Sequence, residues 1–390
     1  MKVVVVGAGF AGIRTALSLA NKKNIEVKLI STESYFEYRP ALYRSATGHS
    51  PLEVAIPLRD FFGYAKNVEV VKDTIVDLDN KSNQVTGESG SVYTYDRLIL
   101  SLGNVTEFFN IKGLKQFAYG VKSIHEALRL KRHIHEQLMD TKTEKNYVVI
   151  GAGATGVELS AELKTYIKKI RKKHKVRPTF NIELIEASPR VLSTMTKRYS
   201  KKVKTRLRHM GIKIHTKTAV KTETIEGIQL PNGSIESKTV VWTAGVANNP
   251  FFKKFPKVFS YGRAGRVVVD EYLMATKNIF VIGDCADTQY SGMAQTAIHD
   301  AKFVANNIIR EQKNKQLIKY KPKKPVYAVP VGKYWAAVSW HGVEIYGLIG
   351  WILRRLADLK VYLSFLPIPK ALSVWRSGFL DEETCPICKV

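Results

Sequence analysis

The stretch MKVVVVGAGFAGIR, residues 1–14, decides the fold of this chain. Its valines, at positions 3–6, form a β-branched apolar run that is typical of a buried parallel strand. The run passes directly into GAGFAG and then into a helical pattern. Gly7 permits a tight turn, Gly9 lets a pyrophosphate approach the backbone, and Gly12 lets the helix pack against the strand. Because the N–H groups of a helix N-terminus favour phosphate, a fingerprint framed in this way predicts a dinucleotide site.

The same pattern returns at residues 147–156, where YVVI is followed by GAGATG and a second helical pattern. The next strand, residues 182–185, ends in Glu186, which is placed to accept hydrogen bonds from both hydroxyls of a ribose. A 2′-phosphate would repel that carboxylate, so the sequence favours NADH over NADPH. In the first unit the corresponding position carries residues 31–33 (STE), whose serine and glutamate are both candidates for an adenosine ribose. Two nucleotide sites predict an enzyme that passes electrons from a nicotinamide to a flavin.

Four further segments bear on nucleotide binding. Residues 34–48 are aromatic and contain an Arg-Pro pair, so they either pack in a core or cover a flavin ring. Residues 97–103 and 239–246 are strands that end in a glycine turn. Residues 278–286 form an apolar strand that closes in Gly-Asp, which suits hydrogen bonding to ribityl hydroxyls.

The totals limit the class of protein. A chain of 390 residues is long enough for two or three domains, and 45% hydrophobic residues are ordinary for a globular protein. Three cysteines give no disulfide framework and favour a reducing compartment. A strand that starts at residue 2 leaves no room for a signal peptide, and no uncharged apolar run reaches the ~18 residues that a spanning helix needs. We therefore expect a cytoplasmic protein.

The formal net charge of +27 is the unusual property. Residues 164–175 and 197–217 are basic and contain no acidic residue. Such runs are usually solvated faces, and the alternative is a face turned toward an anionic cytoplasmic leaflet. Nucleic acid is disfavoured as a partner because no aromatic stacking residues are interleaved in the RNA-binding manner.

Taken in order, GAGFAG, GATG after GA, and FVIGDCA resemble the flavoprotein reductases with two dinucleotide domains. The finer resemblance is to the type II NADH dehydrogenases, the non-pumping NADH:quinone oxidoreductases of respiratory chains. It covers essentially the whole chain and includes RPALYRSATG, AYGVKSIHEALRLKRHI, GATGVELSAEL and VWTAGV. The resemblance implies an α/β fold with two Rossmann-like domains of the pyridine nucleotide-disulfide oxidoreductase type, FAD and NADH as cofactors, and a C-terminal amphipathic segment.

The implied domains are an FAD-binding domain of residues 1–112 and 258–325, an NADH-binding domain of residues 113–257, and a membrane-surface or dimerisation region of residues 326–390. The residues implied to bind FAD are Gly7, Gly9, Phe10, Ala11, Gly12, Ser31, Thr32, Arg39, Pro40, Ile75, Ser101, Leu102, Gly103, Gly283, Asp284, Gln295, Thr296 and Ala297. Those implied to bind NADH are Gly151, Gly153, Ala154, Thr155, Gly156, Glu158, Glu186, Ala244 and Gly245. In the family, the acid at Glu158 lies between nicotinamide and flavin, although the helix macrodipole alone would favour an acid there.

The acceptor site departs from the family. The quinone motif Ala-Gln-x-Ala-x-Gln reads AQTAIH at residues 294–299. Gln295 and His299 are four residues apart, so they share one helix face. We expect Gln295 to position a quinone carbonyl and His299 to protonate it, against the alternative of a packing histidine. Relatives that use thiols are disfavoured, because no cysteine precedes Cys285, and the single pair Cys385 and Cys388 cannot complete a metal site alone.

An apolar helical stripe follows near the C-terminus, with Arg354, Arg355 and Lys360 off the stripe. We expect residues 345–380 to lie as a monotopic anchor on the cytoplasmic face of the membrane, helped by anionic lipid. Docking onto the flavin domain and a homodimer interface are the alternatives. The members of the stripe are Ile345, Leu348, Ile349, Ile352, Leu353, Leu356, Leu359 and Leu363.

Two other functions fit the same nucleotide motifs. One is a soluble NADH-dependent reductase of a small acidic redox carrier, which the positive charge would suit. The other is a flavoprotein similar to apoptosis-inducing factor, whose reduction by NADH changes its associations. Activity with a quinone would separate both from the leading prediction.

Overall fold

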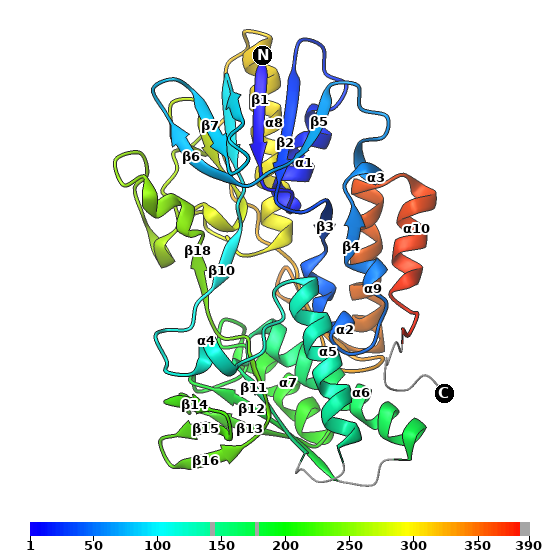
Figure 1. Ribbon diagram of the computed structural model, residues 1–390. Helices are drawn as coiled ribbons and strands as arrows, with labels where there is room; N and C mark the ends of the chain where they lie inside the picture. Colours follow the sequence, from blue (N-terminus) through cyan, green and yellow to red (C-terminus); the bar gives the residue numbers. More distant parts are fainter. Residues whose placement is uncertain (141–144, 176–178, 383–390) are drawn as a thin grey trace.

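A computed structural model describes residues 1–140, 145–175 and 179–382. The first unit is built on a six-stranded sheet in the order β19-β20-β9-β1-β2-β5, at the top of Figure 1. Strand β1 pairs in parallel with both β2 and β9, as a buried strand that opens a nucleotide fold should. The strands of this sheet are β1 (Lys2–Val6), β2 (Glu26–Ser31), β5 (Val68–Lys72), β9 (Arg97–Leu100), β19 (Met274–Thr276) and β20 (Ile279–Val281).

Both faces of this sheet are covered, which explains the uninterrupted apolar run of β1. Val3 and Val5 pack into one core with helices α1 (Phe10–Leu19) and α8 (Ala294–Gln312). Val4 and Val6 face the opposite way, into a second core with a three-stranded antiparallel sheet. That sheet consists of β6 (Ile75–Asp79), β7 (Gln84–Gly87) and β8 (Val92–Thr94).

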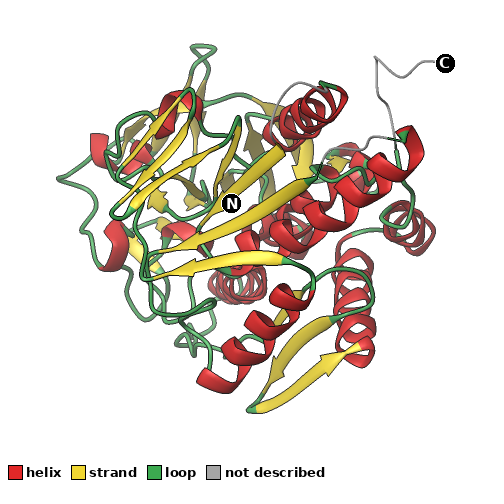
Figure 2. Ribbon diagram, turned by 90° about the horizontal axis from the view of Figure 1, so that it is seen from below, coloured by secondary structure: helices red, strands yellow, loops and turns green. Residues whose placement is uncertain are grey.

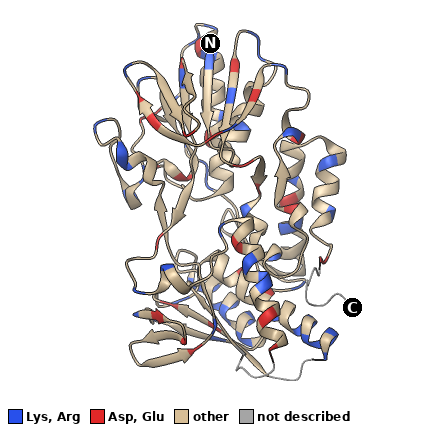
Figure 3. Cartoon of the chain, in the orientation of Figure 1, with Lys and Arg blue, Asp and Glu red and all other residues tan. Residues whose placement is uncertain are grey.

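The second unit lies below the first and repeats its plan with a four-stranded parallel sheet, β13-β12-β11-β17. Its other side carries the antiparallel sheet β14-β15-β16. The strands are β11 (Lys145–Ile150), β12 (Phe180–Glu186), β13 (Ile212–Thr216), β14 (Thr222–Thr224), β15 (Gly227–Leu230), β16 (Gly233–Glu236) and β17 (Thr239–Trp242), and the helices are α4 (Leu114–Phe117), α5 (Ile124–Met139), α6 (Ala154–His174) and α7 (Lys197–His209). The lysines and arginines of the two basic runs lie mainly on α6 and α7 (Figure 3).

Two antiparallel strands join the units. Strand β10 (Asn104–Thr106) leads from the first unit to the second, and β18 (Val246–Asn248) leads back beside it, with Val105 opposite Ala247 (Figure 1). The chain thus leaves the first sheet after β9 and returns to it at β19 and β20. The short elements between these are β3 (Tyr35–Glu37), β4 (Ala55–Pro57), α2 (Leu42–Ser45), α3 (Arg59–Phe62) and the 3₁₀ turns η1 (Arg39–Ala41), η2 (Pro51–Glu53), η3 (Pro250–Lys254), η4 (Arg263–Gly265) and η5 (Gly283–Cys285).

The C-terminal layer begins with the antiparallel sheet β21 (Tyr327–Pro330), β22 (Ala336–Trp340) and β23 (Val343–Gly347). Helix α9 (Leu348–Phe365) follows at once and packs beside α10 (Ile368–Ser377), at the right of Figure 1. Seen from below, most of the long helices lie on one side of the strands of the large sheets (Figure 2). The expectation that the helical stripe starts at Ile345 is wrong: Ile345 lies in β23 opposite Val338, and Gly347, with φ of +79°, separates the strand from the helix.

Helix α9 turns three of its charged residues inward and several of its apolar residues outward. Arg354, Arg355 and Asp358 are buried, whereas Leu348 is 55% and Ile349 64% exposed. A hydrophobic-outward helix of this kind is the reverse of an ordinary surface helix. Within the described residues, no helix is both long enough and apolar enough to cross a bilayer.

Candidate functional site

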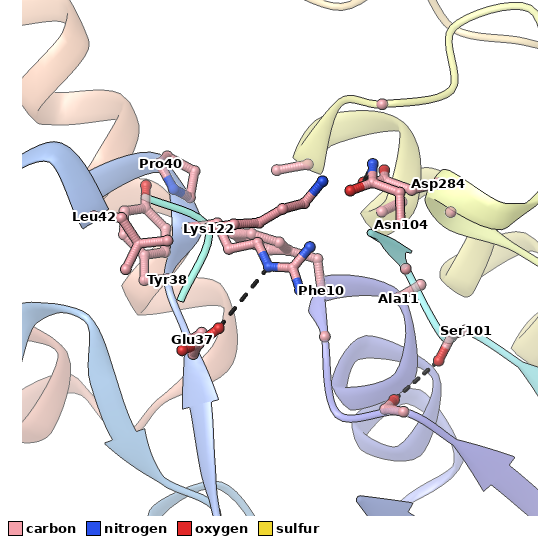
Figure 4. Close-up of a pocket in the computed structure, with 18 of the residues that line it drawn as sticks. Phe10, Ala11, Glu37, Tyr38, Pro40, Leu42, Ser101, Asn104, Lys122 and Asp284 are labelled. Atoms are coloured by element: carbon pink, nitrogen blue, oxygen red, sulfur yellow. Dashed lines mark hydrogen bonds and ion pairs between the residues drawn. The ribbon is translucent and has the colours of Figure 1, made fainter. Parts of the chain in front are cut away.

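The loop between β1 and α1 has the backbone that the glycine fingerprint predicts. Gly7 has φ of +100°, and a Cβ there would lie 2.5 Å from the carbonyl oxygen of Ser101. A Cβ on Gly12 would lie 1.8 Å from the Gly7 oxygen, so only glycine permits this approach of helix and strand. A Cβ on Gly9 would meet nothing within 4 Å, which leaves its backbone open. Ser101 Oγ donates to the Val6 and Gly7 oxygens at 2.9 Å and holds the turn (Figure 4).

The loop between β11 and α6 repeats this arrangement. Gly151 again has φ of +100°, and a Cβ on Gly156 would lie 1.8 Å from the Gly151 oxygen. Gly153 has no atom within 4 Å of its Cβ position. Thr243 Oγ1 takes the place of the serine, donating to the Ile150 oxygen at 2.8 Å and the Gly151 oxygen at 3.0 Å. Both loops therefore present an open backbone at a helix N-terminus, as phosphate binding requires.

A single cavity of about 700 Å³ runs from the first loop toward the second unit and the C-terminal layer. Sites of this size hold cofactors and small ligands. Of the residues predicted to bind FAD, the structure brings together on the cavity wall Gly7, Gly9, Phe10, Ala11, Ser31, Thr32, Arg39, Pro40, Ile75, Ser101, Leu102, Gly103, Gly283, Asp284, Gln295 and Ala297. Gly12 and Thr296 lie behind the wall.

The second unit contributes less of the wall. Of the residues predicted for NADH, only Ala154, Thr155, Glu158 and Gly245 line the cavity. Gly151, Gly153, Gly156, Glu186 and Ala244 lie outside it. The Glu186 carboxylate accepts the N–H of Ala152 at 2.6 Å and of Ser188 at 2.7 Å, so it holds the second loop in place.

Two acidic side chains on the cavity wall, Asp284 and Glu37, are held by hydrogen bonds to distant parts of the chain. Asp284 Oδ2 accepts from Asn104 Nδ2 at 2.8 Å, which turns the carboxylate along the cavity wall (Figure 4). Glu37 accepts the N–H of Ile124 at 2.8 Å and faces Arg39 at 4.0 Å. Asn104 and Glu37 were not predicted from the sequence, because each depends on a partner that lies far away along the chain.

Lys122 is the most informative residue that the sequence did not reveal. Its side chain extends into the cavity (Figure 4), and its buried Nζ has no hydrogen-bond partner in the described part of the chain. Burial and the Arg39 guanidinium together lower the pKa of Lys122 to about 8, against the opposing effect of Asp284 and Glu126. One sequence signal could have indicated its position, the pattern Ser123-x-x-Glu126 that is typical of a helix start. In the structure Ser123 Oγ accepts the N–H of Glu126 at 3.2 Å, and the Glu126 carboxylate accepts the N–H of Lys122 at 2.6 Å. An unpaired buried ammonium calls for an anion.

Glu158 lies where the second unit meets the cavity. Burial raises the pKa of Glu158 to about 8, opposed by the positive charges of Arg354 and Arg44. A pKa raised to this range favours the neutral carboxylic acid at pH 7. A carboxyl group that titrates near neutrality inside a cavity can hold and exchange a proton.

The face of α8 that carries Gln295 and His299 is occupied by the chain itself. Gln295 lines the cavity, but its amide donates to the Val326 oxygen at 2.8 Å and accepts the Val326 N–H at 3.0 Å. His299 Nε2 contacts the Lys321 oxygen at 2.9 Å, and the structure does not bring His299 to the cavity. The two residues share a helix face as predicted, and this geometry favours the packing role for His299.

One of the three cysteines lies in the described part of the chain. Cys285 is buried and its Sγ donates to the Gly103 oxygen at 3.2 Å. Cys385 and Cys388 lie outside the described residues. Among the residues that the structure describes, no group of three or more His, Cys, Asp or Glu side chains is arranged to hold a metal ion.

Comparison with known proteins agrees with this geometry. A model of the family described as pyridine nucleotide-disulphide oxidoreductase matches residues 1–301. The type II NADH:quinone oxidoreductase Ndh of Mycobacterium tuberculosis is 29% identical over 98% of this chain and 89% of its own length. The type II NADH:quinone oxidoreductase of Staphylococcus aureus is 28% identical over 79% of this chain and 82% of its own.

Solved structures show the same fold. The NDH2 protein of Plasmodium falciparum in complex with NADH superposes with a TM-score of 0.88 at 19% identity, covering 97% of each chain. The sulfide:quinone oxidoreductase of Aquifex aeolicus gives a TM-score of 0.80 at 20% identity, covering 97% of this chain and 92% of its own. The chain therefore belongs to the pyridine nucleotide-disulphide oxidoreductase family and resembles, over nearly its whole length, the type II NADH:quinone oxidoreductases within it.

Proposed function

We propose that this protein transfers electrons from NADH through FAD to a membrane quinone without pumping protons. The observation that carries the proposal is the cavity that joins one open glycine loop to the entrance of a second, with Glu158 at the junction. The full-length resemblance to type II NADH:quinone oxidoreductases supports the same acceptor class. A soluble reductase of an acidic carrier and an NADH-responsive signalling flavoprotein are not favoured.

The residues present fit FAD. The open backbone at Gly9 leaves room for a pyrophosphate, and the unpaired Lys122 ammonium supplies the positive charge that a pyrophosphate needs. Ser31 and Asp284 are hydrogen-bonding groups on the cavity wall for the ribose and the ribityl chain. When bound, FAD supplies a two-electron carrier between a hydride donor and an acceptor.

NADH binds, in this proposal, at the second loop. The N-terminus of α6 faces its phosphates, and Glu186 accepts from its ribose hydroxyls with the lone pairs not used by Ala152 and Ser188. The nicotinamide then lies near Thr155 and Glu158, the second unit's contribution to the cavity wall. Glu158, protonated at pH 7, can supply a proton on the acceptor side of the reaction.

The experiment that tests this function is a comparison of acceptors. Purified holoenzyme is supplied with NADH and with a ubiquinone or menaquinone analogue in vesicles, or with an acidic ferredoxin in solution. We expect turnover with a quinone to exceed turnover with the ferredoxin by at least 100-fold. Turnover with the ferredoxin and none with either quinone would overturn the proposal in favour of a soluble carrier reductase.

The outward apolar face of α9 and α10 suggests how the protein reaches a membrane quinone. We propose that this face lies in the interface of the cytoplasmic leaflet, with the basic helices α6 and α7 attracted to anionic lipid. A homodimer that buries the same face is the alternative. The most exposed apolar residues of these helices, and of the turn that follows α10, are Leu348, Ile349, Ile352, Leu356, Leu363, Ile368, Phe379 and Leu380.

Attachment is tested by flotation with vesicles that contain phosphatidylglycerol. The double variant Ile349→Glu/Ile352→Glu introduces charge on the exposed face without touching the core, and we expect its recovery with vesicles to fall at least tenfold. Ile225→Glu, at a site that is 77% exposed on the second unit, is the control and should float like the wild type. Wild-type protein that stays free of these vesicles at low salt, and runs as a dimer, would contradict the membrane assignment.

A further inference from the structure

A cluster of buried charges joins α9 to the first unit. Arg44 Nη2 lies 2.8 Å from Glu53 Oε1 and 3.2 Å from Asp358 Oδ2. Arg355 Nη1 lies 3.0 Å from Glu53 and 3.6 Å from Asp358. Arg354 completes the cluster through its ion pair with Asp358, one helical turn away. All five side chains are at most 10% exposed, so water contributes little to their solvation.

Arg354 is the member of this cluster that reaches the cavity. It lines the wall together with Ala357 and Val361, which follow at three- and four-residue steps on the same face of α9. Its guanidinium is held by Asp358 and by the carbonyl oxygen of Pro40 at 3.3 Å. Asp358 is held in turn by the Tyr38 hydroxyl at 2.5 Å. The arginine is therefore fixed in position on the cavity wall.

The charges of the cluster do not cancel. Three arginines face two carboxylates, Glu53 and Asp358, which leaves one positive charge in a buried setting. On the cavity wall, Glu158 interacts electrostatically with Arg354, and its pKa, raised by burial to about 8, favours the neutral carboxylic acid at pH 7. An uncompensated buried cation is costly, and it is stabilised by an anion that forms beside it.

We propose that Arg354 binds the acceptor, donating hydrogen bonds to a quinone carbonyl oxygen and stabilising the oxyanion that this oxygen becomes on reduction. The assignment rests on the proposed function and names the residue that selects the acceptor. Its place is the part of the cavity wall where Pro40, Leu42 and Tyr43 meet Arg354, Ala357 and Val361. Planar guanidinium groups suit a carbonyl or phenolate oxygen because their N–H groups lie in one plane.

The redox step balances in these terms. NADH is oxidised to NAD⁺, and its two electrons and one proton, carried through the flavin, convert the quinone into a hydroquinone monoanion. A second proton, from Glu158 or from water, then gives the neutral hydroquinone. Arg354 acts on the oxygen that carries negative charge between these two events, and it neither donates nor receives a proton.

The test uses a matched pair of probes with the oxidised holoenzyme. 2-Hydroxy-1,4-naphthoquinone is an anion at neutral pH, whereas its methyl ether, 2-methoxy-1,4-naphthoquinone, has almost the same shape and no charge. Dissociation constants are measured by titration calorimetry, without turnover. We expect the wild type to bind the anion at least tenfold more tightly than the ether, and Arg354→Met to bind the two within twofold of each other.

Three further measurements separate this role from a structural one. Arg354→Lys keeps the charge and should retain most of the preference. Lys360→Met removes an exposed charge from the same helix and should leave the preference unchanged. The variant Arg354→Met should fold, since Asp358 keeps Arg44, Arg355 and Tyr38 as partners. Its flavin should still be reduced by NADH at the wild-type rate, and reoxidation by a quinone should slow at least tenfold.

Two results would overturn the inference about Arg354 alone, and a third would also overturn the proposed function. If Arg354→Met still binds the anionic naphthoquinone more tightly than its methyl ether, the charge that selects the anion lies elsewhere. Arg354→Met that slows flavin reduction by NADH while keeping quinone reoxidation assigns the arginine to the flavin. A wild type that turns over no quinone and binds neither probe removes the proposed function itself, and Arg354 with it.

Discussion

The loops of residues 7–12 and 151–156 share one backbone and differ in their surroundings. In both, φ of the first glycine is +100° and a Cβ on the last glycine would lie 1.8 Å from the oxygen of the first. A hydroxyl group fastens each turn, Ser101 in one and Thr243 in the other. The first loop, however, forms part of the wall of the cavity, whereas Gly151 and Gly153 of the second lie outside that wall.

In the proposed function, this difference separates a cofactor that stays bound from a substrate that leaves. A nucleotide on the first loop is surrounded by the first sheet, by the segment from β3 to α2, and by the turn η5. A nucleotide on the second loop is reached from outside and enters the cavity only at Ala154, Thr155, Glu158 and Gly245. The same fingerprint therefore serves two roles, which the rest of the chain decides.

The largest expected effect comes from blocking each loop with the same substitution. The Cβ positions of Gly9 and Gly153 are open, and both residues have negative φ, so valine fits the backbone and blocks only the ligand. We expect Gly9→Val to be purified with at least tenfold less flavin, measured by the ratio of absorbance at 450 and 280 nm. Gly153→Val should keep its flavin and lose at least 100-fold in the rate of reduction by NADH. Loss of flavin from both variants would erase the distinction between the loops.

The two nucleotide loops are the part of the molecule that the sequence predicts best. Their constraints are local: the first and last glycine of each loop are required by atoms a few residues away or next to an adjacent strand, and the middle glycine leaves the backbone open. The strands, the glycine turns and the cavity positions of Ser31, Arg39 and Asp284 follow from the same local patterns and from the family resemblance.

The residues that the sequence did not reveal depend on contacts between distant segments. Lys122 matters because its helix cap turns it toward a cavity built by other elements. Arg354 lies off the apolar stripe in the sequence, which is typical of a solvated residue, but it is buried and bonds to Asp358 on its own helix and to the carbonyl oxygen of the distant Pro40. Ile345 matched the helical period and is nevertheless in a strand, because pairing with β22 and the turn at Gly347 override the pattern.

A smaller effect is expected at Glu186, the last residue of β12, where the two units carry different residues. A carboxylate that accepts from ribose hydroxyls contributes on the order of 1.5–3 kcal/mol. We expect the wild type to prefer NADH over NADPH by well over tenfold in kcat/KM. Glu186→Ser should lower this ratio, mainly because kcat/KM for NADH falls. The fall should be larger than the lost hydrogen bonds to the ribose alone predict, since the Ala152 N–H also loses its acceptor. Equal use of NADPH by the wild type would contradict the assignment.

Glu158 predicts a pH dependence of stability at the junction of the units. Burial raises its pKa from 4.5 to about 8, so the folded protein binds more protons than the unfolded chain between these values. Its contribution to stability is therefore present below about pH 4.5 and is lost as the pH rises through about 8. We expect Tm of Glu158→Gln, relative to the wild type, to rise by a few degrees between pH 5 and 8. A constant difference across this range would show that Glu158 is not buried as a carboxylic acid.

The smallest effect is expected at His299. Since its Nε2 contacts the Lys321 oxygen and the residue does not line the cavity, His299→Gln should change the rate of quinone reoxidation by less than twofold. The pH profile of that half-reaction between pH 6 and 8 should also be unchanged. A flattened profile in stopped-flow measurements would restore His299 as the proton donor to the quinone.

The most direct measurement of the central claim is an anaerobic sequence of two mixing steps, followed at the flavin absorbance. One equivalent of NADH is mixed with the holoenzyme, and a ubiquinone or menaquinone analogue is added after the NAD⁺ has been removed. We predict that the flavin is bleached in the first step and restored in the second, at rates sufficient for turnover. A flavin that NADH cannot reduce, or that stays reduced in the presence of both quinones, would contradict the assignment of one loop to a retained FAD and the other to an exchanging NADH.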